Sequence, residues 1–89
     1  MNSNVNWQLR IRNDVHKILK KFPIQDREKI LDVVYGLVSD PYAGDIEKTG
    51  KERNVWRRRV GAYRVFYELL AKGKIIWVFH VKRRTSTTY

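Results

Sequence analysis

Residues 55–84 read Val-Trp-Arg-Arg-Arg-Val-Gly-Ala-Tyr-Arg-Val-Phe-Tyr-Glu-Leu-Leu-Ala-Lys-Gly-Lys-Ile-Ile-Trp-Val-Phe-His-Val-Lys-Arg-Arg, and this stretch decides the fold. It consists of three runs rich in Val, Ile, Tyr, Phe and Trp, which Gly61-Ala62 and residues 71–74 separate. β-Branched and aromatic runs broken by glycine-containing turns are typical of consecutive hairpins. The pattern therefore predicts an antiparallel meander with strands at 55–60, 63–70 and 75–82.

Alternation within these strands sorts the side chains onto two faces of the sheet. One face is predicted to be apolar and to form the core, with Trp56, Val60, Tyr63, Val65, Tyr67, Leu69, Ile75, Trp77, Phe79 and Val81. The other face is predicted to collect positive charge, with Arg57, Arg59, Arg64, His80, Lys82 and Arg84. Arg58 falls on the apolar face, so its guanidinium must reach solvent or find an acid.

The sequence before the meander predicts one strand and two helices. Residues 5–11 alternate apolar and polar side chains, as a half-buried strand does. Apolar residues spaced i, i+3, i+4 and i+7 from Val15 predict a first helix, which ends before Pro23. The same spacing predicts a second helix between Gln25 and Asp40.

Residues 40–54 hold Pro41, Gly44 and Gly50 and lack a sustained periodicity, which predicts a loop. The element order is therefore β-α-α-β-β-β, an α+β fold in a single domain over residues 1–89. We expect the two helices to pack on the apolar face of an antiparallel sheet, because that face cannot stay wet. The first strand is expected to join the sheet, along an edge.

The composition limits the kinds of function. The chain has 89 residues, two histidines and no cysteine, which excludes disulfides and argues against a metal centre. A basic segment followed by an apolar run, the mark of a signal peptide, is absent from the N-terminus, and no apolar run reaches the length of a membrane span. The sequence predicts a cytoplasmic protein with neither a metal nor a small-molecule cofactor.

The positive charge is unevenly distributed. Residues 1–54 hold ten Lys and Arg against eight Asp and Glu, a balance of +2, whereas residues 55–89 hold nine against one, a balance of +8. Charge concentrated in this way predicts a polyanionic partner, RNA or DNA. The alternative is a solvated basic face without a ligand.

RNA cleavage is one reaction that such a face can support without a metal. Each phosphate of RNA has its own nucleophile, the neighbouring 2′-hydroxyl, and an enzyme must align it, neutralise the growing charge and move two protons. Arginine forks bind phosphate oxygens in pairs but hold their protons too tightly to transfer them. Proton transfer is therefore expected from Tyr89, Lys82 or His80, and Phe66 is the candidate for stacking on a base.

Two segments and the last residue resemble a known family. Trp-Arg-Arg-Arg-Val-Gly-Ala-Tyr-Arg-Val-Phe-Tyr-Glu at 56–68, the later Val-Phe-His-Val-Lys-Arg-Arg and the terminal tyrosine are similar to the RelE/ParE toxin superfamily. That resemblance implies the toxin of a type II toxin–antitoxin pair. RelE-like members enter the ribosomal A site and cleave mRNA, whereas ParE-like members inhibit DNA gyrase.

The resemblance implies a ribosome-dependent endoribonuclease, with gyrase inhibition or RNA binding without catalysis as alternatives. It carries catalytic roles onto Arg57, Arg59, Arg64, Arg84 and Tyr89. It carries RNA contacts onto Arg57, Arg59 and Arg83, and the predicted basic face adds Phe66, His80 and Lys82 to the expected RNA contacts. The implied partners are a cognate antitoxin, the ribosome and mRNA. Arg58 departs from the family pattern, which usually has an aliphatic residue at this position.

Overall fold

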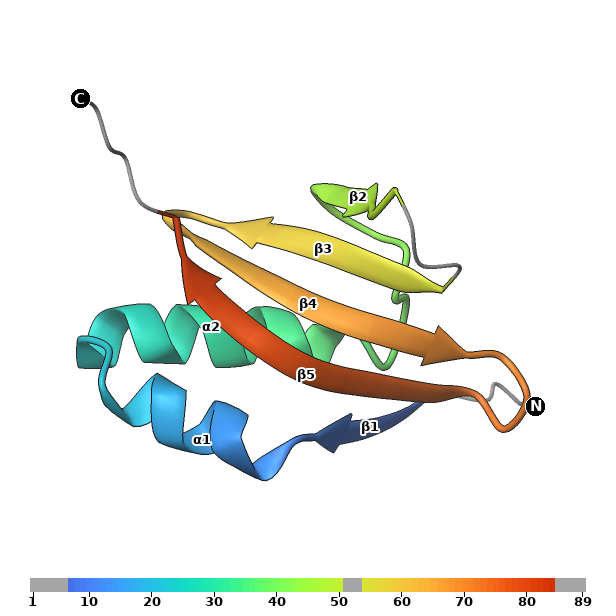
Figure 1. Cartoon of the computed structure of the whole chain (residues 1–89), viewed down its shortest axis with the longest axis horizontal. Helices are drawn as coiled ribbons and strands as arrows, with labels where there is room; N and C mark the ends of the chain where they lie inside the picture. Colours follow the sequence, from blue (N-terminus) through green and yellow to red (C-terminus); the bar gives the residue numbers. More distant parts are fainter. Residues whose placement is uncertain (1–6, 51–53, 85–89) are drawn as a thin grey trace.

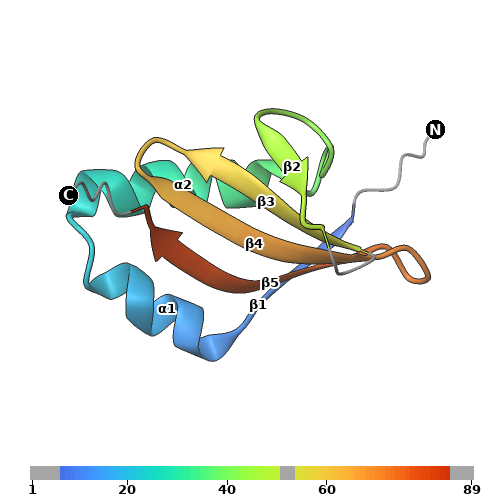
Figure 2. The same ribbon diagram turned by 45° about the horizontal axis from the view of Figure 1, so that its top comes forward.

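The computed structural model describes residues 7–50 and 54–84, which form two helices and five strands. In chain order the elements are β1 (Gln8–Ile11), α1 (Asn13–Lys20), α2 (Ile24–Gly36), β2 (Ile46–Lys48), β3 (Val55–Val60), β4 (Tyr63–Leu70) and β5 (Ile75–Arg83). Both helices pack on the same face of the sheet (Figures 1 and 2). The predicted α+β fold, with two N-terminal helices on one face of a meander, is confirmed.

The strand order in the sheet is β1-β5-β4-β3-β2. Strands β3, β4 and β5 pair antiparallel as predicted, and β1 lies at an edge. Two details differ from the prediction. β1 pairs parallel with β5, so the sheet is mixed. The chain between them contains both helices and three strands, which is long enough for a parallel return. The predicted loop contains the short strand β2, whose three residues form a ladder with β3 but are too few to show a period.

The register of β5 also differs, because of a β-bulge. Phe66 lies opposite His80 while its neighbour Tyr67 lies opposite Val78, so Phe79 is the extra residue. An extra residue inverts the alternation on one side of the bulge. The prediction that Ile75, Trp77 and Phe79 face the core was therefore wrong.

Ile76 and Val78 take those core positions, each with 0% of its surface exposed. Trp77 is half-buried opposite Glu68 on the face away from the helices, which we call the open face. Val81 lies beyond the bulge and is buried as predicted.

The core lies between the helices and the sheet. Its buried side chains are Val15, Leu19, Ile30, Val34, Leu37, Val60, Tyr63, Val65, Tyr67, Leu69, Ile76, Val78 and Val81. Trp56 packs against this cluster from the helix side but is only half-buried.

Two buried tyrosines of β4 donate hydrogen bonds to α2 and to the segment that follows α2. The Tyr67 hydroxyl donates to the Pro41 carbonyl oxygen (2.7 Å), and burial raises the pKa of Tyr67 to about 12. The Tyr63 hydroxyl donates to Asp26 of α2 (2.7 Å), and this hydrogen bond raises the pKa of Tyr63. Asp26 of α2 and Pro41 in the segment after α2 thus hold β4 at its first residue and near its middle, both from the side that faces the helices.

Candidate nucleic-acid interface

A row of cations crosses three adjacent strands of the open face, one position from the end of the β3–β4 hairpin. Arg59 of β3 lies opposite Arg64 of β4, and Arg64 lies opposite Lys82 of β5. Directly opposed residues have Cβ atoms only about 4.5–5.5 Å apart, and like charges at that spacing destabilise a sheet. We call Arg57, Arg59, Arg64 and Lys82 the basic cluster. An anion bound there would relieve the repulsion.

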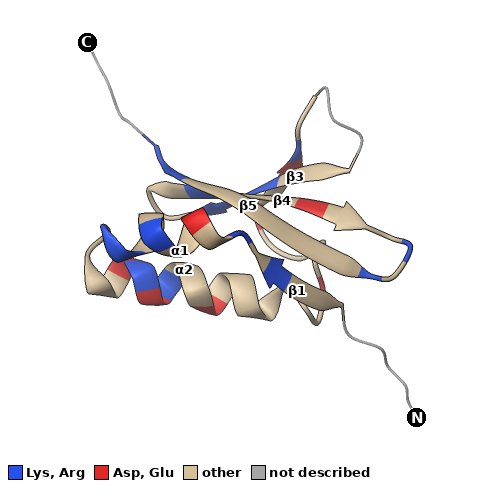
Figure 3. Cartoon of the chain, turned by 60° about the horizontal axis from the view of Figure 1, so that its bottom comes forward, with Lys and Arg blue, Asp and Glu red and all other residues tan. Residues whose placement is uncertain are grey.

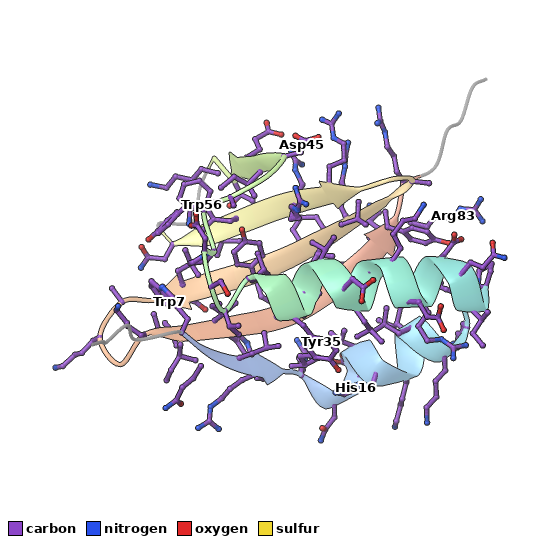
Figure 4. All side chains as sticks on the ribbon, turned by 180° about the vertical axis from the view of Figure 1, so that it is seen from behind. Trp7, His16, Tyr35, Asp45, Trp56 and Arg83 are labelled. Atoms are coloured by element: carbon purple, nitrogen blue, oxygen red, sulfur yellow. The ribbon has the colours of Figure 1, made fainter. Side chains whose placement is uncertain are left out.

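Strand β2 brings two carboxylates to one side of the basic cluster. Glu47 lies opposite Arg57, and its Oε1 accepts a hydrogen bond from Arg57 Nη2 (2.5 Å). Asp45 Oδ2 lies 3.8 Å from Arg59 Nε, and Figure 4 shows Asp45 at the edge of the sheet. Neither acid was predicted to belong to the site, because residues 40–54 were predicted to form a loop. Two acids shortly before a basic strand are the only signal in the sequence.

The ion pairs divide the basic cluster into two parts. Arg57 and Arg59 have carboxylate partners, whereas no described carboxylate lies within 4.0 Å of Arg64, Lys82 or Arg84. The uncompensated charge therefore centres on the middle strand and the end of β5.

The Glu47–Arg57 pair predicts a measurable titration. The hydrogen bond and charge of Arg57 lower the pKa of Glu47 below its ordinary value of 4.5, and Arg59 and Arg64 act in the same direction. A lowered pKa means that the pair is intact above pH 4.5 and is lost as the pH falls through the lowered value. NMR titration of the Glu47 carboxyl should give a midpoint below 4.5, and Arg57→Ala should return it towards 4.5.

Lys29→Ala is the control for that titration, because Lys29 is exposed on α2, on the other side of the sheet. It should leave the Glu47 midpoint unchanged. A midpoint at or above 4.5 in the unaltered chain would mean that Arg57 and Glu47 are not paired in solution.

Aromatic side chains continue the open face away from the cations. Phe66 lies opposite His80, and their ring centroids are 5.5 Å apart. The Phe79 ring lies 6.5 Å from the Phe66 ring. Phe66 and His80 thus lie together on the open face, as their alternation in the sequence predicts, and His80 is exposed. Bases of single-stranded RNA stack on rings presented in this way.

The remaining candidate residues belong to the end of β5 and to the segment that follows it. Arg83 is opposite Tyr63 on the helix side, with its guanidinium 6.0 Å from the centre of that ring, and Figure 4 shows it beside α2. Arg84 is exposed, and its backbone N–H donates to the Ala62 carbonyl oxygen (2.6 Å), which places it beside the β3–β4 turn. Tyr89 lies outside the described residues.

Arg58 lies on the helix side, as predicted, and is half-buried. Its guanidinium packs against Gly44, where there is no room for a Cβ, and it lines a pocket of about 190 Å³ together with Val33 and Asp40. Among residues 7–50 and 54–84, no carboxylate lies within 4.0 Å of this guanidinium. Its charge is therefore not part of the basic cluster.

Two further features concern metals and membranes. Over the described part of the chain, no three or more His, Cys, Asp or Glu side chains are grouped so that they could bind a metal ion. Neither described helix is long and apolar enough to cross a membrane.

The side chains of the open face are suited to binding RNA and to reactions at its phosphates. The cations can bind a phosphate chain and stabilise charge that grows on a phosphorus centre, because guanidinium forks match phosphate oxygens. The imidazole of His80 is a side chain that can serve as a general acid or base. The rings of Phe66 and Phe79 can hold a neighbouring base.

The family model described as "ParE toxin of type II toxin-antitoxin system, parDE" matches residues 5–87. No curated protein matches the chain in a sequence comparison.

Solved structures of RelE proteins share the fold. RelE in the archaeal RelE–RelB complex from Pyrococcus horikoshii OT3 is 25% identical, with a TM-score of 0.80 over 92% of this chain and 99% of that chain. A chain of the RelB–RelE complex from Methanococcus jannaschii is 25% identical, with a TM-score of 0.68 over 82% of this chain and 87% of that chain. The isolated E. coli RelE toxin is 14% identical, with a TM-score of 0.78 over 91% of this chain and 87% of that chain, a likeness of fold alone.

Proposed function

Because the chain belongs to the ParE toxin family of type II toxin–antitoxin systems, within the RelE/ParE superfamily, we propose that it is a toxin that cleaves mRNA on the ribosome. The observation that carries the proposal is the row Arg59–Arg64–Lys82 across the open face. A cation row of this kind stabilises a pentacoordinate phosphate, which the proposed reaction forms and gyrase inhibition does not.

In the proposed reaction the 2′-oxygen attacks the adjacent phosphorus and the bond from phosphorus to the 5′-oxygen breaks. A base on the protein takes the proton of the 2′-hydroxyl, and an acid gives a proton to the departing 5′-oxygen. Arg64 holds the non-bridging oxygens, and Arg59 and Arg57 support it once RNA competes with Asp45 and Glu47 for them. Phe66 stacks on a neighbouring base, and Lys82 and Arg84 bind flanking phosphates. No step requires a metal or a cofactor.

The proton carriers in this proposal are His80 and Tyr89. His80 is exposed beside Phe66, within the described open face. Tyr89 follows Arg84 by five positions in the sequence, and the family resemblance is the reason to include it. Cations near a phenol favour the phenolate, which can accept the 2′-hydroxyl proton.

Tyr89→Phe separates the chemistry of the phenol from its ring. The change keeps the ring and removes the oxygen, so we expect cleavage to fall about 100-fold or more, in the range of general base catalysis. Ribosome binding should stay within about twofold, measured by cosedimentation. If the Tyr89→Phe protein cleaves at the unaltered rate, the phenol is not the base, and His80 or Lys82 becomes the next candidate.

The cognate antitoxin is the expected protein partner, as RelB is of RelE in the complexes with similar folds. The net charge of +10 favours an acidic segment on the antitoxin. We propose that this segment covers part of the basic cluster and thereby excludes RNA, and that the pair acts in the cytoplasm.

Gyrase inhibition is the second candidate, because the matching family model is described by ParE. Two assays with one protein preparation decide between them. Purified ribosomes programmed with a defined mRNA should show cleavage by primer extension, while gyrase should supercoil relaxed plasmid at its normal rate. Blocked supercoiling with intact mRNA would reject the ribonuclease in favour of gyrase inhibition, and intact mRNA with normal supercoiling would reject both.

A further inference from the structure

Trp77 is placed on the open face by the bulge in β5. It lies opposite Glu68 of β4 on one side and beside Arg10 of β1 on the other. Its indole is half-buried and is not among the side chains that pack against the core. A large aromatic side chain thus lies between two strands, on the same face as the basic cluster, without a structural role in the core.

Trp77 lines an open groove of about 580 Å³ where β1 meets α1. The other residues around the groove are Leu9, Arg10, Ile11, Arg12, Asn13 and Asp14. Arg12 Nε lies 3.1 Å from Asp14 Oδ1, whereas Arg10 is exposed and has no carboxylate within 4.0 Å among the described residues. Figure 3 shows basic residues on β1 and just before α1. The groove thus combines an indole with an uncompensated guanidinium.

Strand β5 connects the groove to the basic cluster, because it contains both Trp77 and Lys82. Between Lys82 and Trp77 the open face carries His80 and Phe79, and Phe66 lies across from them on β4. At about 3.3 Å per residue, the distance along β5 from Lys82 to Trp77 is roughly 16 Å. One ligand that contacts both ends must therefore be longer than a single nucleotide.

We propose that this groove is a second nucleotide subsite, in which an unpaired base of the bound RNA stacks on Trp77 and Arg10 contacts the adjoining phosphate. The proposal rests on the ribonuclease function proposed above, and it adds a binding site remote from the reacting phosphate. Single-stranded RNA is recognised by stacking of splayed bases on aromatic rings combined with cations along the backbone.

The acids around the groove favour RNA over an acidic protein segment. Glu68 lies opposite Trp77, and Asp14 is part of the rim. Carboxylates repel the phosphates of RNA as well as an acidic peptide, but a base stacked on the indole keeps its phosphate apart from them and can donate hydrogen bonds to them from its amino groups.

Binding of a fluorescently labelled single-stranded RNA of twelve nucleotides, measured by anisotropy at low salt, tests the subsite. The comparison ligand is an abasic oligonucleotide of equal length, which keeps the phosphates and lacks the bases. Trp77→Leu should weaken binding of the base-bearing RNA by about 5- to 150-fold, the range for one stacked base, and leave the abasic ligand unchanged. Trp77→Phe should retain most of the affinity, because it keeps a ring.

Arg10→Gln should weaken both ligands and reduce the slope of log affinity against log salt by about one. Matched controls are Trp7→Leu, a half-buried tryptophan packed against the core, and Lys29→Gln, an exposed cation on α2. The first control should bind both ligands normally, and the second should leave the salt slope unchanged. Urea unfolding of each variant identifies any that fail to fold.

The proposal is overturned if Trp77→Leu binds the base-bearing RNA as tightly as the unaltered chain, or loses the abasic ligand equally. It is also overturned if the groove variants bind RNA normally but lose the antitoxin, which would make the groove a protein-binding site. Cleavage assays on ribosomes keep the two proposals apart. If the unaltered chain does not cleave mRNA, the proposed ribonuclease function is rejected. If the Trp77→Leu variant cleaves mRNA with an unchanged KM, only the proposed subsite is rejected. A raised KM with little change in kcat supports it.

Discussion

Arg64→Ala is expected to lower the rate of mRNA cleavage on ribosomes by about 100- to 1000-fold, the effect of removing one preorganised donor from a developing oxyanion. Arg64 is the middle cation of the row, opposite Arg59 on one strand and Lys82 on the other. Its backbone is held by strands on both sides, and the buried neighbours Tyr63 and Val65 fix the pleat. The guanidinium therefore meets the phosphate with little loss of conformational freedom.

The fold should tolerate this substitution, because Arg64 is on the open face and removing it relieves repulsion from two neighbouring cations. We expect the urea midpoint to stay the same or to rise. Arg64→Lys keeps the charge but loses the planar fork, so its cleavage rate should lie between those of the unaltered chain and Arg64→Ala.

Arg83→Ala is the matched control, since it removes the same side chain from the helix side of the same sheet. Its cleavage rate should stay within a few-fold of the unaltered chain. Equal losses in Arg64→Ala and Arg83→Ala would show that overall positive charge matters and position does not. Full activity of Arg64→Ala would remove this residue from the reaction.

The meander and the basic cluster could be predicted from the sequence because both follow from local alternation. Regular pairing of β3 with β4 is sufficient to place Arg57, Arg59 and Arg64 on one face of the sheet. The pairing of Val60 with Tyr63 through to Val55 with Glu68 has no irregularity. The alternation in the sequence was therefore sufficient to predict the face of each side chain where the two paired strands contain no bulge.

The parts that could not be predicted depend on pairing between distant strands. The bulge at Phe79 appears only when β5 is aligned with β4, and no composition signal marks it. The ion pairs of Glu47 and Asp45 require β2 to lie beside β3, and β2 is too short to show alternation. Both features change which side chains the open face presents. The bulge places Trp77 on this face, and β2 places acids beside two of its arginines.

Ile76→Ala and Trp77→Ala test that register through stability. Ile76 has 0% of its surface exposed, so we expect truncation to cost about 2–5 kcal/mol, the range for a buried isoleucine. A domain of this size has a total stability of about 5–15 kcal/mol, so the loss is a large part of it. Trp77→Ala should cost only about 1 kcal/mol, the centre of the range for ordinary substitutions, although it removes the larger side chain.

Urea unfolding followed by circular dichroism measures the free energy of unfolding of both variants. If the active protein cannot be produced, both substitutions are made in the Arg64→Ala chain. The predicted order is unusual because removing a tryptophan from a core normally costs at least as much as removing an isoleucine. Strict alternation without the bulge would bury Trp77 and expose Ile76, and would reverse the order. A Trp77→Ala protein less stable than Ile76→Ala would therefore place Trp77 in the core, and the nucleotide subsite proposed on the open face would lose its aromatic ring.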